Sequence, residues 1–192
     1  AAPGDIDERW RNLTDIDIVA LHYWVEERMP IASFDPATRL VTSSRRSIFA
    51  LKDDTAGTWA RYYVENVFEA MTEPGEWYLD RPSGTLYYFP MPGENIETTE
   101  VFAPRIDELL SITGRPADGT YVEFLRFVGI TFEHADWHQP SGGHDPDTGS
   151  EPGIDYAASP QAAAHLGGSI SFEGARFCAV EDCVIRHVGR YG

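Results

Sequence analysis

The sequence predicts a mainly β fold that contains a solenoid, in which short strands repeat and stack on one another. Three features support this prediction. Short runs rich in β-branched and aromatic residues alternate with turn residues along most of the chain, and only one segment has helical periodicity. Two stretches of the C-terminal half also resemble each other in residue order. A β-sandwich would give many short strands as well, but it would not account for this internal repeat.

The N-terminal part begins with strand signals. Residues 18–24 are an apolar, β-rich run that suits a strand covered on both faces. A hairpin is expected from 31 to 42, because Asp35 and Pro36 fit the first two positions of a type I turn. In residues 62–71 apolar residues recur at helical spacing, so we expect a short helix there.

An aromatic hairpin is predicted from the runs 76–80 and 85–89, which a Pro/Ser/Gly connector at 81–84 joins. Along its first strand, Trp77 and Tyr78 point to opposite faces. We expect most of the rings to pack against the rest of the protein. The alternative, stacking on a sugar, requires that one or two rings remain exposed.

The internal repeat lies beyond residue 109. Residues 111–114 correspond to 171–174, an offset of 60 residues, and residues 125–134 correspond to 178–187, an offset of 53. We assign the difference of seven residues to an insertion around 116–119, which has loop composition. Each copy therefore reads as short strands separated by brief turns and ends on a histidine. Stacked copies would bury Val, Ile and Phe in one continuous core.

The order of these segments resembles that of the right-handed parallel β-helix (PbH1) repeat proteins, which include bacterial glycoside hydrolases acting on plant or algal polysaccharides. The residues that carry the resemblance are 18–24, 61–70, the aromatic hairpin, 127–134 and 180–192. The resemblance implies a partial right-handed parallel β-helix with an inserted small β domain. Its implied parts are early strands and a hairpin in 1–52, an inserted β domain with the short helix and the aromatic hairpin in 53–104, and resumed coils in 105–192 with a long loop at 140–168.

The same resemblance implies a function. It points to a secreted or periplasmic carbohydrate-active enzyme, a glycoside hydrolase that degrades a polysaccharide or oligosaccharide with two carboxyl groups. Two alternatives on this fold stay open: a polysaccharide lyase and a non-catalytic carbohydrate-binding or adhesin module. A lyase needs Arg or Lys beside its groove to neutralise a uronate, and residues 135–174 contain neither.

Both ends of the sequence suggest a partial chain. It starts on Ala1 and stops at Gly192, directly after a strand-like run. We therefore expect the remaining part of a longer polypeptide to be a partner. The resemblance places the acid/base pair of the family on coils that would follow.

Carboxylates near the repeat are the candidate catalytic residues within this chain. Glycoside hydrolysis needs two carboxyl groups, about 5–5.5 Å apart for retention or about 6.5–9.5 Å apart for inversion of configuration. Adjacent strands of a sheet lie about 4.8 Å apart, so carboxylates at matching positions of neighbouring coils could meet either requirement. The candidates are Asp136, Glu173, Glu181 and Asp182. Asp182 falls in a turn, where a structural hydrogen bond is the alternative role.

Four further residues are candidates for sugar binding. Trp137 and His138 follow Asp136 directly, which combines a stacking ring, an imidazole and a carboxylate. His134 and His187 end the two copies of the repeat. They could contact sugar hydroxyls, and the alternative is a structural stack of the two rings.

Composition limits the partners. The chain has 192 residues, with 15 Lys and Arg against 31 Asp and Glu, which gives a formal net charge of −16. A surface this acidic repels phosphate backbones and anionic lipids. Nucleic acid and membranes are therefore poor candidate partners. No run of 18 apolar residues predicts a transmembrane helix. The acidity suits a neutral or cationic substrate, and solubility alone would also explain it.

No cofactor is expected. Asp145 and Asp147 lie in a loop that loosely matches the start of a calcium-binding loop, but the terminal Glu is not at the proper spacing, which favours a solvated acidic loop. Cys178 and Cys183 have no metal-site spacing, and we expect both to be small buried apolar groups.

Overall fold

The computed structural model describes residues 1–52, 57–138, 151, 153–159 and 167–192. Its regular elements are the strands β1 to β14 and three short 3-10 turns, η1 (Leu13–Asp15), η2 (Phe68–Ala70) and η3 (Pro116–Asp118), so the prediction of a mainly β chain is confirmed. The chain forms two compact units. Unit 1 is Ala1–Thr99 with Pro140–Ala164, and unit 2 is Glu100–Gln139 with His165–Gly192.

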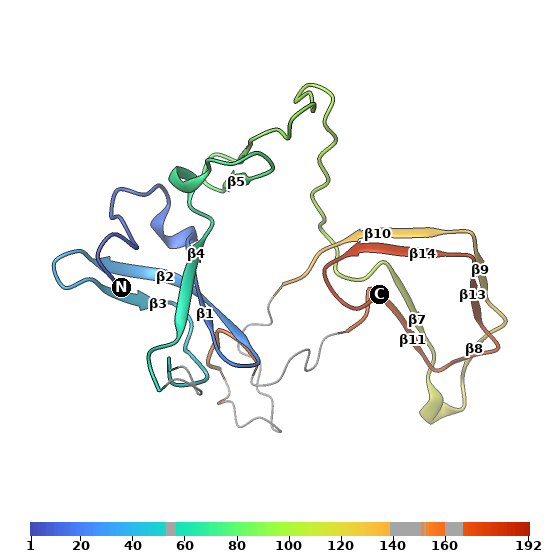
Figure 1. The fold of residues 1–192 in the computed structure, drawn as a ribbon. Coiled ribbons are helices and arrows are strands. Elements are labelled where there is room, and N and C mark those ends of the chain that lie inside the picture. Colours follow the sequence, from blue (N-terminus) through green and yellow to red (C-terminus); the bar gives the residue numbers. More distant parts are fainter. Residues whose placement is uncertain (53–56, 139–150, 152, 160–166) are drawn as a thin grey trace. The chain divides into compact units, whose positions relative to one another are not determined.

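Unit 1 is built on an antiparallel sheet of four strands in the order β3-β2-β1-β4 (Figure 1). The strands are β1 (Asp17–Leu21), β2 (Glu26–Asp35), β3 (Leu40–Ser43) and β4 (Arg61–Glu65). The hairpin of β2 and β3 closes at residues 35–38, where the sequence predicts a turn, and Asp35 accepts the backbone N–H of Ala37. Apolar residues of the sheet and of the segment before it form the core. Its buried members are Ile6, Ile16, Ile31 and Val67.

The helix predicted for residues 62–71 is wrong. The first part of this segment is β4, which pairs in register with β1, and η2 is the only helical turn in it. Tyr62, Tyr63 and Val64 are β-branched or aromatic, and such residues lose less rotamer freedom in a strand than in a helix. The backbone of this segment also pairs with the edge of β1 that β2 leaves open, which stabilises the strand over the helix. Asn66 ends the strand in the left-handed region, at φ 61°.

The aromatic hairpin consists of β5 (Trp77–Asp80) and β6 (Thr85–Tyr88), as the sequence predicts. One face packs: Tyr78 is buried, and its ring contacts Phe68 edge-on at 5.4 Å. The hydroxyl of Tyr78 accepts a hydrogen bond from Asn12 at 2.9 Å. The opposite face remains open, with Trp77 64% exposed. Packing thus explains the aromatic residues on the face of Tyr78. The exposed ring of Trp77 leaves sugar stacking open as the alternative for the other face.

The buried carboxylate of Glu27 holds the segment that follows β3 against strand β2. The side chain of Glu27 is fully buried on β2 and accepts hydrogen bonds from the hydroxyl of Ser47 (3.0 Å) and from the backbone N–H groups of Ile48 (3.1 Å) and Phe49 (3.2 Å). His22 Nε2 also lies 2.9 Å from Glu27 Oε1, at an angle that does not make a hydrogen bond. Burying a charge is tolerated only where donors compensate it, as they do here.

Unit 2 consists of two sets of four strands. The first strand set is β7 (Leu110–Thr113), β8 (Val122–Glu123), β9 (Arg126–Val128) and β10 (Thr131–Ala135). The second strand set is β11 (Ile170–Glu173), β12 (Ala175–Arg176), β13 (Ala179–Glu181) and β14 (Val184–Val188). Each strand of the first set pairs in parallel with the strand at the same place in the second (Figure 1).

The pairing reproduces the internal repeat of the sequence. Ser111 pairs with Ser171, an offset of 60 residues, and Phe127 pairs with Val180, an offset of 53. The inserted residues form η3 between β7 and β8, where the sequence predicts an insertion. Equivalent residues of the two copies in the sequence therefore lie opposite each other in the structure.

The backbones of the two sets approach each other closely at a pair of glycines, Gly114 and Gly174. Gly114 N–H donates to the carbonyl of Glu173 at 2.8 Å. A Cβ atom on Gly114 would lie 2.4 Å from the carbonyl oxygen of Gly174, closer than two such atoms can come. Glycine is required at this position by contact between backbones.

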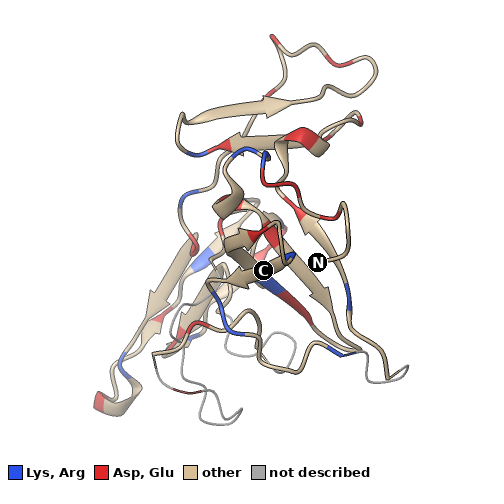
Figure 2. Cartoon of the chain, turned by 90° about the vertical axis from the view of Figure 1, so that its left-hand side faces the viewer, with Lys and Arg blue, Asp and Glu red and all other residues tan. Residues whose placement is uncertain are grey.

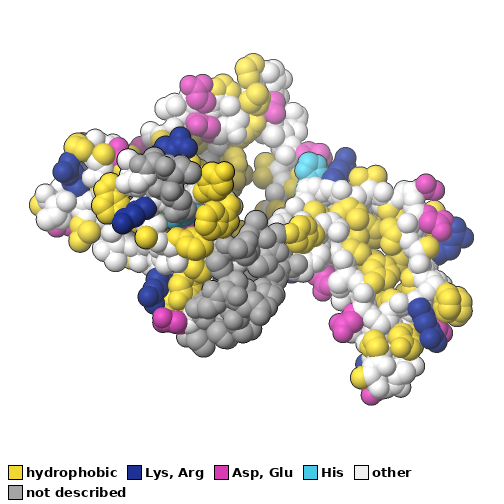
Figure 3. Space-filling model, turned by 60° about the horizontal axis from the view of Figure 1, so that its bottom comes forward, with side chains coloured by type: hydrophobic (Ala, Val, Ile, Leu, Met, Phe, Trp, Pro, Cys, Tyr) yellow, Lys and Arg dark blue, Asp and Glu magenta, His cyan; other side chains and the backbone are white. Residues whose placement is uncertain are grey.

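Charge and apolar surface are distributed differently. Acidic residues occur on strands and connections throughout the described chain (Figure 2). In unit 2, by contrast, hydrophobic side chains gather within the strand sets and are visible from outside (Figure 3, right-hand part). Among the described hydrophobic residues of this unit, only Ala135 is buried. The two cysteines, also in unit 2, are free and half-buried rather than buried as the sequence suggests.

The predicted limits of an inserted domain at 53–104 stay a prediction. β4 lies within this range and pairs with β1, which precedes it. Within the described ranges, no helix has the length and apolar character needed to cross a membrane.

We predict that Gly114→Ala destabilises unit 2. The added methyl group must displace the backbone of Gly174, and overpacking of this kind costs about 1–3 kcal/mol. Hydrogen exchange of the amides in β7 and β11 measures the loss. Gly167→Ala is the control, because its Cβ would meet its nearest neighbour, Arg190 Nη1, at an ordinary 3.5 Å. Equal exchange in both variants would contradict the close approach.

We predict that Glu27→Ala lowers the free energy of unfolding of unit 1 by about 1–3 kcal/mol, since it leaves the part-buried donors of the turn at Ser47–Phe49 unpaired. Glu27→Gln keeps one acceptor and should lose less. Urea unfolding followed by tryptophan fluorescence gives both values. Glu26→Ala, on the exposed face of the same strand, should change stability by less than about 0.5 kcal/mol. A loss as large as that of Glu27→Ala would show that the strand, not the buried carboxylate, is sensitive.

Candidate functional site

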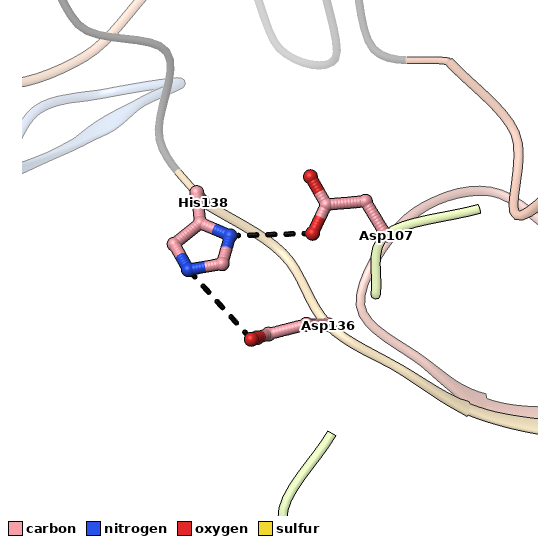
Figure 4. A group of neighbouring side chains, drawn as sticks. All are labelled: Asp107, Asp136 and His138. Atoms are coloured by element: carbon pink, nitrogen blue, oxygen red, sulfur yellow. Dashed lines mark hydrogen bonds and ion pairs between the residues drawn. The ribbon is translucent and has the colours of Figure 1, made fainter. Parts of the chain in front are cut away.

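Three ionisable side chains of unit 2 converge beside the ends of the strands (Figure 4). Asp107 lies before β7, while Asp136 and His138 follow β10. One polar atom from each lies within 4.8 Å of the others. The ring of His138 stands between the carboxylates, with Nδ1 3.2 Å from Asp107 Oδ1 and Nε2 3.7 Å from Asp136 Oδ2.

Backbone hydrogen bonds bring these segments together. The N–H of Asp136 donates to the carbonyl of Ile106 at 2.8 Å, which joins the chain after β10 to the chain before β7. The N–H of Gly189 donates to the carbonyl of Ala135 at 3.1 Å, which continues the pairing of β10 with β14 by one residue. A side chain at Gly189 would collide with Trp137 Cβ, at 2.6 Å. The site therefore depends on the pairing of β10 with β14.

Arg190 is the fourth ionisable member of the site. Its Nη2 donates to Asp107 Oδ2 at 2.7 Å, and its side chain is mostly buried. Asp107 thus contacts a guanidinium through one oxygen and faces the imidazole of His138 with the other. Its negative charge is balanced and its orientation is fixed.

Asp136 is held less tightly. Its Oδ1 accepts the backbone N–H of Trp137 at 2.8 Å, and its Oδ2 faces His138 at the longer distance. The side chains of Trp137 and His138 are both exposed. An indole, an imidazole and a carboxylate are therefore accessible to a ligand at one place.

This arrangement suits two kinds of chemistry. One carboxyl oxygen of Asp107 and one of Asp136 lie within 4.8 Å of each other, which is near enough for the two carboxyl groups to act on one glycosidic bond. The three atoms are also spaced as ligands of a metal ion, but the guanidinium of Arg190 on Asp107 would repel a cation. Acid–base chemistry on a neutral ligand fits the residues better.

The candidate residues proposed from the sequence lie in different places in the structure. It joins Asp136, Trp137 and His138 in one place. Glu181 instead forms an ion pair with Arg126, with Nε at 3.1 Å from Oε1, and connects the two strand sets. Asp182 occupies the turn after β13 in the left-handed conformation, at φ 50°. Glu173 is exposed at the end of β11. A catalytic role for these last three stays a prediction.

His134 and His187 form a stack, the alternative that the sequence left open. Their ring centroids lie 5.4 Å apart at an interplanar angle of 8°, and Phe102 stacks on the other face of His134 at 4.1 Å. Beside them, the hydrogen bond from Arg186 lowers the pKa of Glu133 below its ordinary value. Sugar binding by the two histidines stays a prediction.

The sequence interpretation missed Asp107 and Arg190. Asp107 belongs to an ordinary charged run, and no local signal singles it out. Arg190 could have been found, because the offset of 53 residues, continued past His187, sets residue 190 against Trp137. The proposed calcium ligands Asp145 and Asp147 lie outside the residues that the structure describes.

Comparison of the chain with family models, with curated proteins and with solved structures finds no match.

We predict a measurable coupling between Asp107 and Arg190. A double-mutant cycle of Asp107→Asn and Arg190→Ala should give about 1 kcal/mol, between the values typical of exposed ion pairs and of buried charged hydrogen bonds. The readout is hydrogen exchange of β10 and β14. The exposed pair Arg115–Asp118, at 3.5 Å, should give a coupling near zero. No coupling between Asp107 and Arg190 would contradict the described site.

Proposed function

We propose that this chain is part of a secreted or periplasmic carbohydrate-active enzyme, a glycoside hydrolase that acts on a polysaccharide or oligosaccharide. The observation that carries the proposal is the pair of carboxylates, Asp107 and Asp136, with oxygens within 4.8 Å beside the exposed ring of Trp137. Carboxylate pairs and an aromatic ring are what cleavage and positioning of a sugar require.

We further propose that unit 2 belongs to a right-handed parallel β-helix, in which residues 53–104 are an inserted small β domain. Support comes from four parallel strand pairs that keep the repeat offsets and from strands too short to form separate hairpins. In such a stack, residues that follow matching strands lie along one side. Asp136 and Arg190 occupy such positions.

In the proposed mechanism the two carboxylates have different roles. Asp107, whose charge Arg190 balances, is the carboxylate that attacks the anomeric carbon. Asp136, which has no guanidinium partner in the described structure, protonates the oxygen of the leaving sugar and then takes a proton from the water that releases the product. Trp137 stacks on the sugar. The ring of His138 stands between the two carboxylates, so in this mechanism it moves aside to admit the sugar and then binds its hydroxyl groups.

A polysaccharide lyase is the second candidate. Arg190 supplies, at this site, the cation that a lyase needs to neutralise a uronate, although Asp107 engages it at 2.7 Å. The products distinguish the two reactions, because hydrolysis gives a new reducing end and elimination gives an unsaturated, ultraviolet-absorbing uronate.

The test is a panel of neutral and uronate-containing glycans, with products followed by mass spectrometry. Asp107→Asn and Asp136→Asn should each reduce turnover by about 10²- to 10⁴-fold, the usual contribution of a positioned acid or base. Trp137→Ala should raise KM more than it lowers kcat. Asp118→Asn, an exposed carboxylate on η3, is the matched control and should leave both unchanged.

The outcomes separate the alternatives. Turnover that survives both Asp substitutions would overturn their catalytic role. Glycan binding that Trp137→Ala weakens, without any product, would favour the non-catalytic binding module. Neither binding nor turnover across the panel would contradict the proposed function.

A further inference from the structure

The ring of His138 occupies the place that a substrate of the candidate site needs (Figure 4). Its Nδ1 lies 3.2 Å from Asp107 Oδ1 and its Nε2 lies 3.7 Å from Asp136 Oδ2, so the ring stands between the two carboxylates. In the proposed reaction both carboxylates act on one glycosidic bond. The sugar therefore binds productively only after the ring has left. We call the present place of the ring the closed position.

The closed position suits a charged ring. A neutral imidazole has one N–H donor and one nitrogen lone pair, so it donates to one carboxylate and presents its lone pair to the other. An imidazolium carries a hydrogen on each nitrogen and donates to both. The contact with Asp107 is within hydrogen-bond range, and the contact with Asp136 is a longer ion pair. Protonation of the ring strengthens both contacts at once.

The ionisable groups around the ring come from three segments. Asp107 precedes β7, Asp136 follows β10, and Arg190 follows β14 and donates to Asp107 Oδ2 at 2.7 Å. Glu108, beside Asp107, is engaged instead by the hydroxyl of Ser171. The two carboxylates and the guanidinium sum to a charge of −1, and a charged ring brings the sum to zero. A neutral ring leaves one negative charge without compensation.

The ring can leave without disturbing the carboxylates. The side chain of His138 is 71% exposed. The backbone before it is fixed, because the N–H of Asp136 donates to the carbonyl of Ile106 at 2.8 Å and Gly189 packs closely against Trp137. Rotation about the side-chain bonds of an exposed residue is fast. Such a rotation takes the ring out of the closed position while the rest of the site stays in place.

We propose that His138 is a proton-operated gate of the candidate site, closed when its ring is charged and open when its ring is neutral. The gate rests on the proposed function, in which Asp107 and Asp136 act on a sugar. Histidine is the side chain that ordinarily changes its charge between about pH 5 and 8. Protonation of the ring and binding of the sugar exclude each other in this arrangement, so each weakens the other by the same factor.

The direction of the pH dependence follows from this exclusion. As the pH rises through the range in which the ring loses its proton, the closed position is lost and the apparent affinity for the sugar increases. As the pH falls, the open fraction shrinks, and the apparent affinity falls with it. Because one proton is involved, the limit is about a tenfold loss of affinity for each pH unit. Binding of the sugar at the acid end of this range releases the proton of the ring.

The first test compares the wild type with His138→Asn, which keeps a polar side chain but removes the charge change. The probe is a glycan that the wild type turns over, with kcat/KM measured from about pH 4.5 to 8. The wild type should lose kcat/KM by about tenfold per pH unit on the acid side, and calorimetry in buffers of different ionisation enthalpy should show proton release on binding. His138→Asn should lack this step. Asp118→Asn, on η3, is the control and should keep the profile of the wild type.

The second test needs no substrate. In the wild type without glycan, the carboxyl ¹³C signals of Asp107 and Asp136 should both shift at the pH at which the ring of His138 titrates. His138→Asn should abolish this common shift. Circular dichroism verifies that the variant remains folded.

The two tests separate the gate from the proposed function. Turnover with a pH profile that His138→Asn leaves unchanged, or carboxyl signals that do not follow the ring, would overturn the gate and leave the proposed function standing. Neither turnover nor glycan binding by either protein at any pH would overturn the proposed function and the gate with it. The common shift alone would then show an ion-pair cluster without an enzymatic role.

Discussion

The parallel register between the two strand sets is the constraint on which unit 2 depends. Each residue of β8, β9 and β10 lies opposite the residue 53 positions later, so one register sets the inner pairs, the outer ion pairs and the stacked rings together. A slip by one residue would turn Val180 and Ile185 outward and separate the three ion pairs. The candidate site depends on the same register, because the bond between Gly189 and Ala135 brings Arg190 to Asp107.

The two units solve the problem of burial in different ways. Unit 1 has a closed core around Ile16 and Ile31, and it can even hold the carboxylate of Glu27 away from water because three donors surround it. Unit 2 has two layers of strands and an interior that stays half-exposed. Stacked strands gain most of their stability from neighbouring layers.

The sequence predicted the parts of the fold that repeat or that follow local rules. The 53-residue offset anticipated the pairing of Phe127 with Val180, because parallel stacking places equivalent residues opposite each other. The segment around Val64 was misread, since apolar spacing cannot show that β1 offers it a free edge. Asp136 and His138 were found as neighbours in sequence. Asp107 was not, because only the closure of the strand sets brings it to them.

The turns of unit 2 connect its register to the position of the site. The first strand set has three left-handed residues, Phe124 and Gly129 at corners between strands and His134 within β10, and the second set repeats them 53 residues later at Phe177, Asp182 and His187. Glycine, aspartate and histidine adopt this conformation readily. Asp182 stands where the first set has glycine, so the corner alone accounts for that residue. His134 and His187 have this conformation inside β10 and β14, one residue before each strand ends. The chain that follows these strands carries Asp136 and Arg190, which lie beside Asp107 in the site.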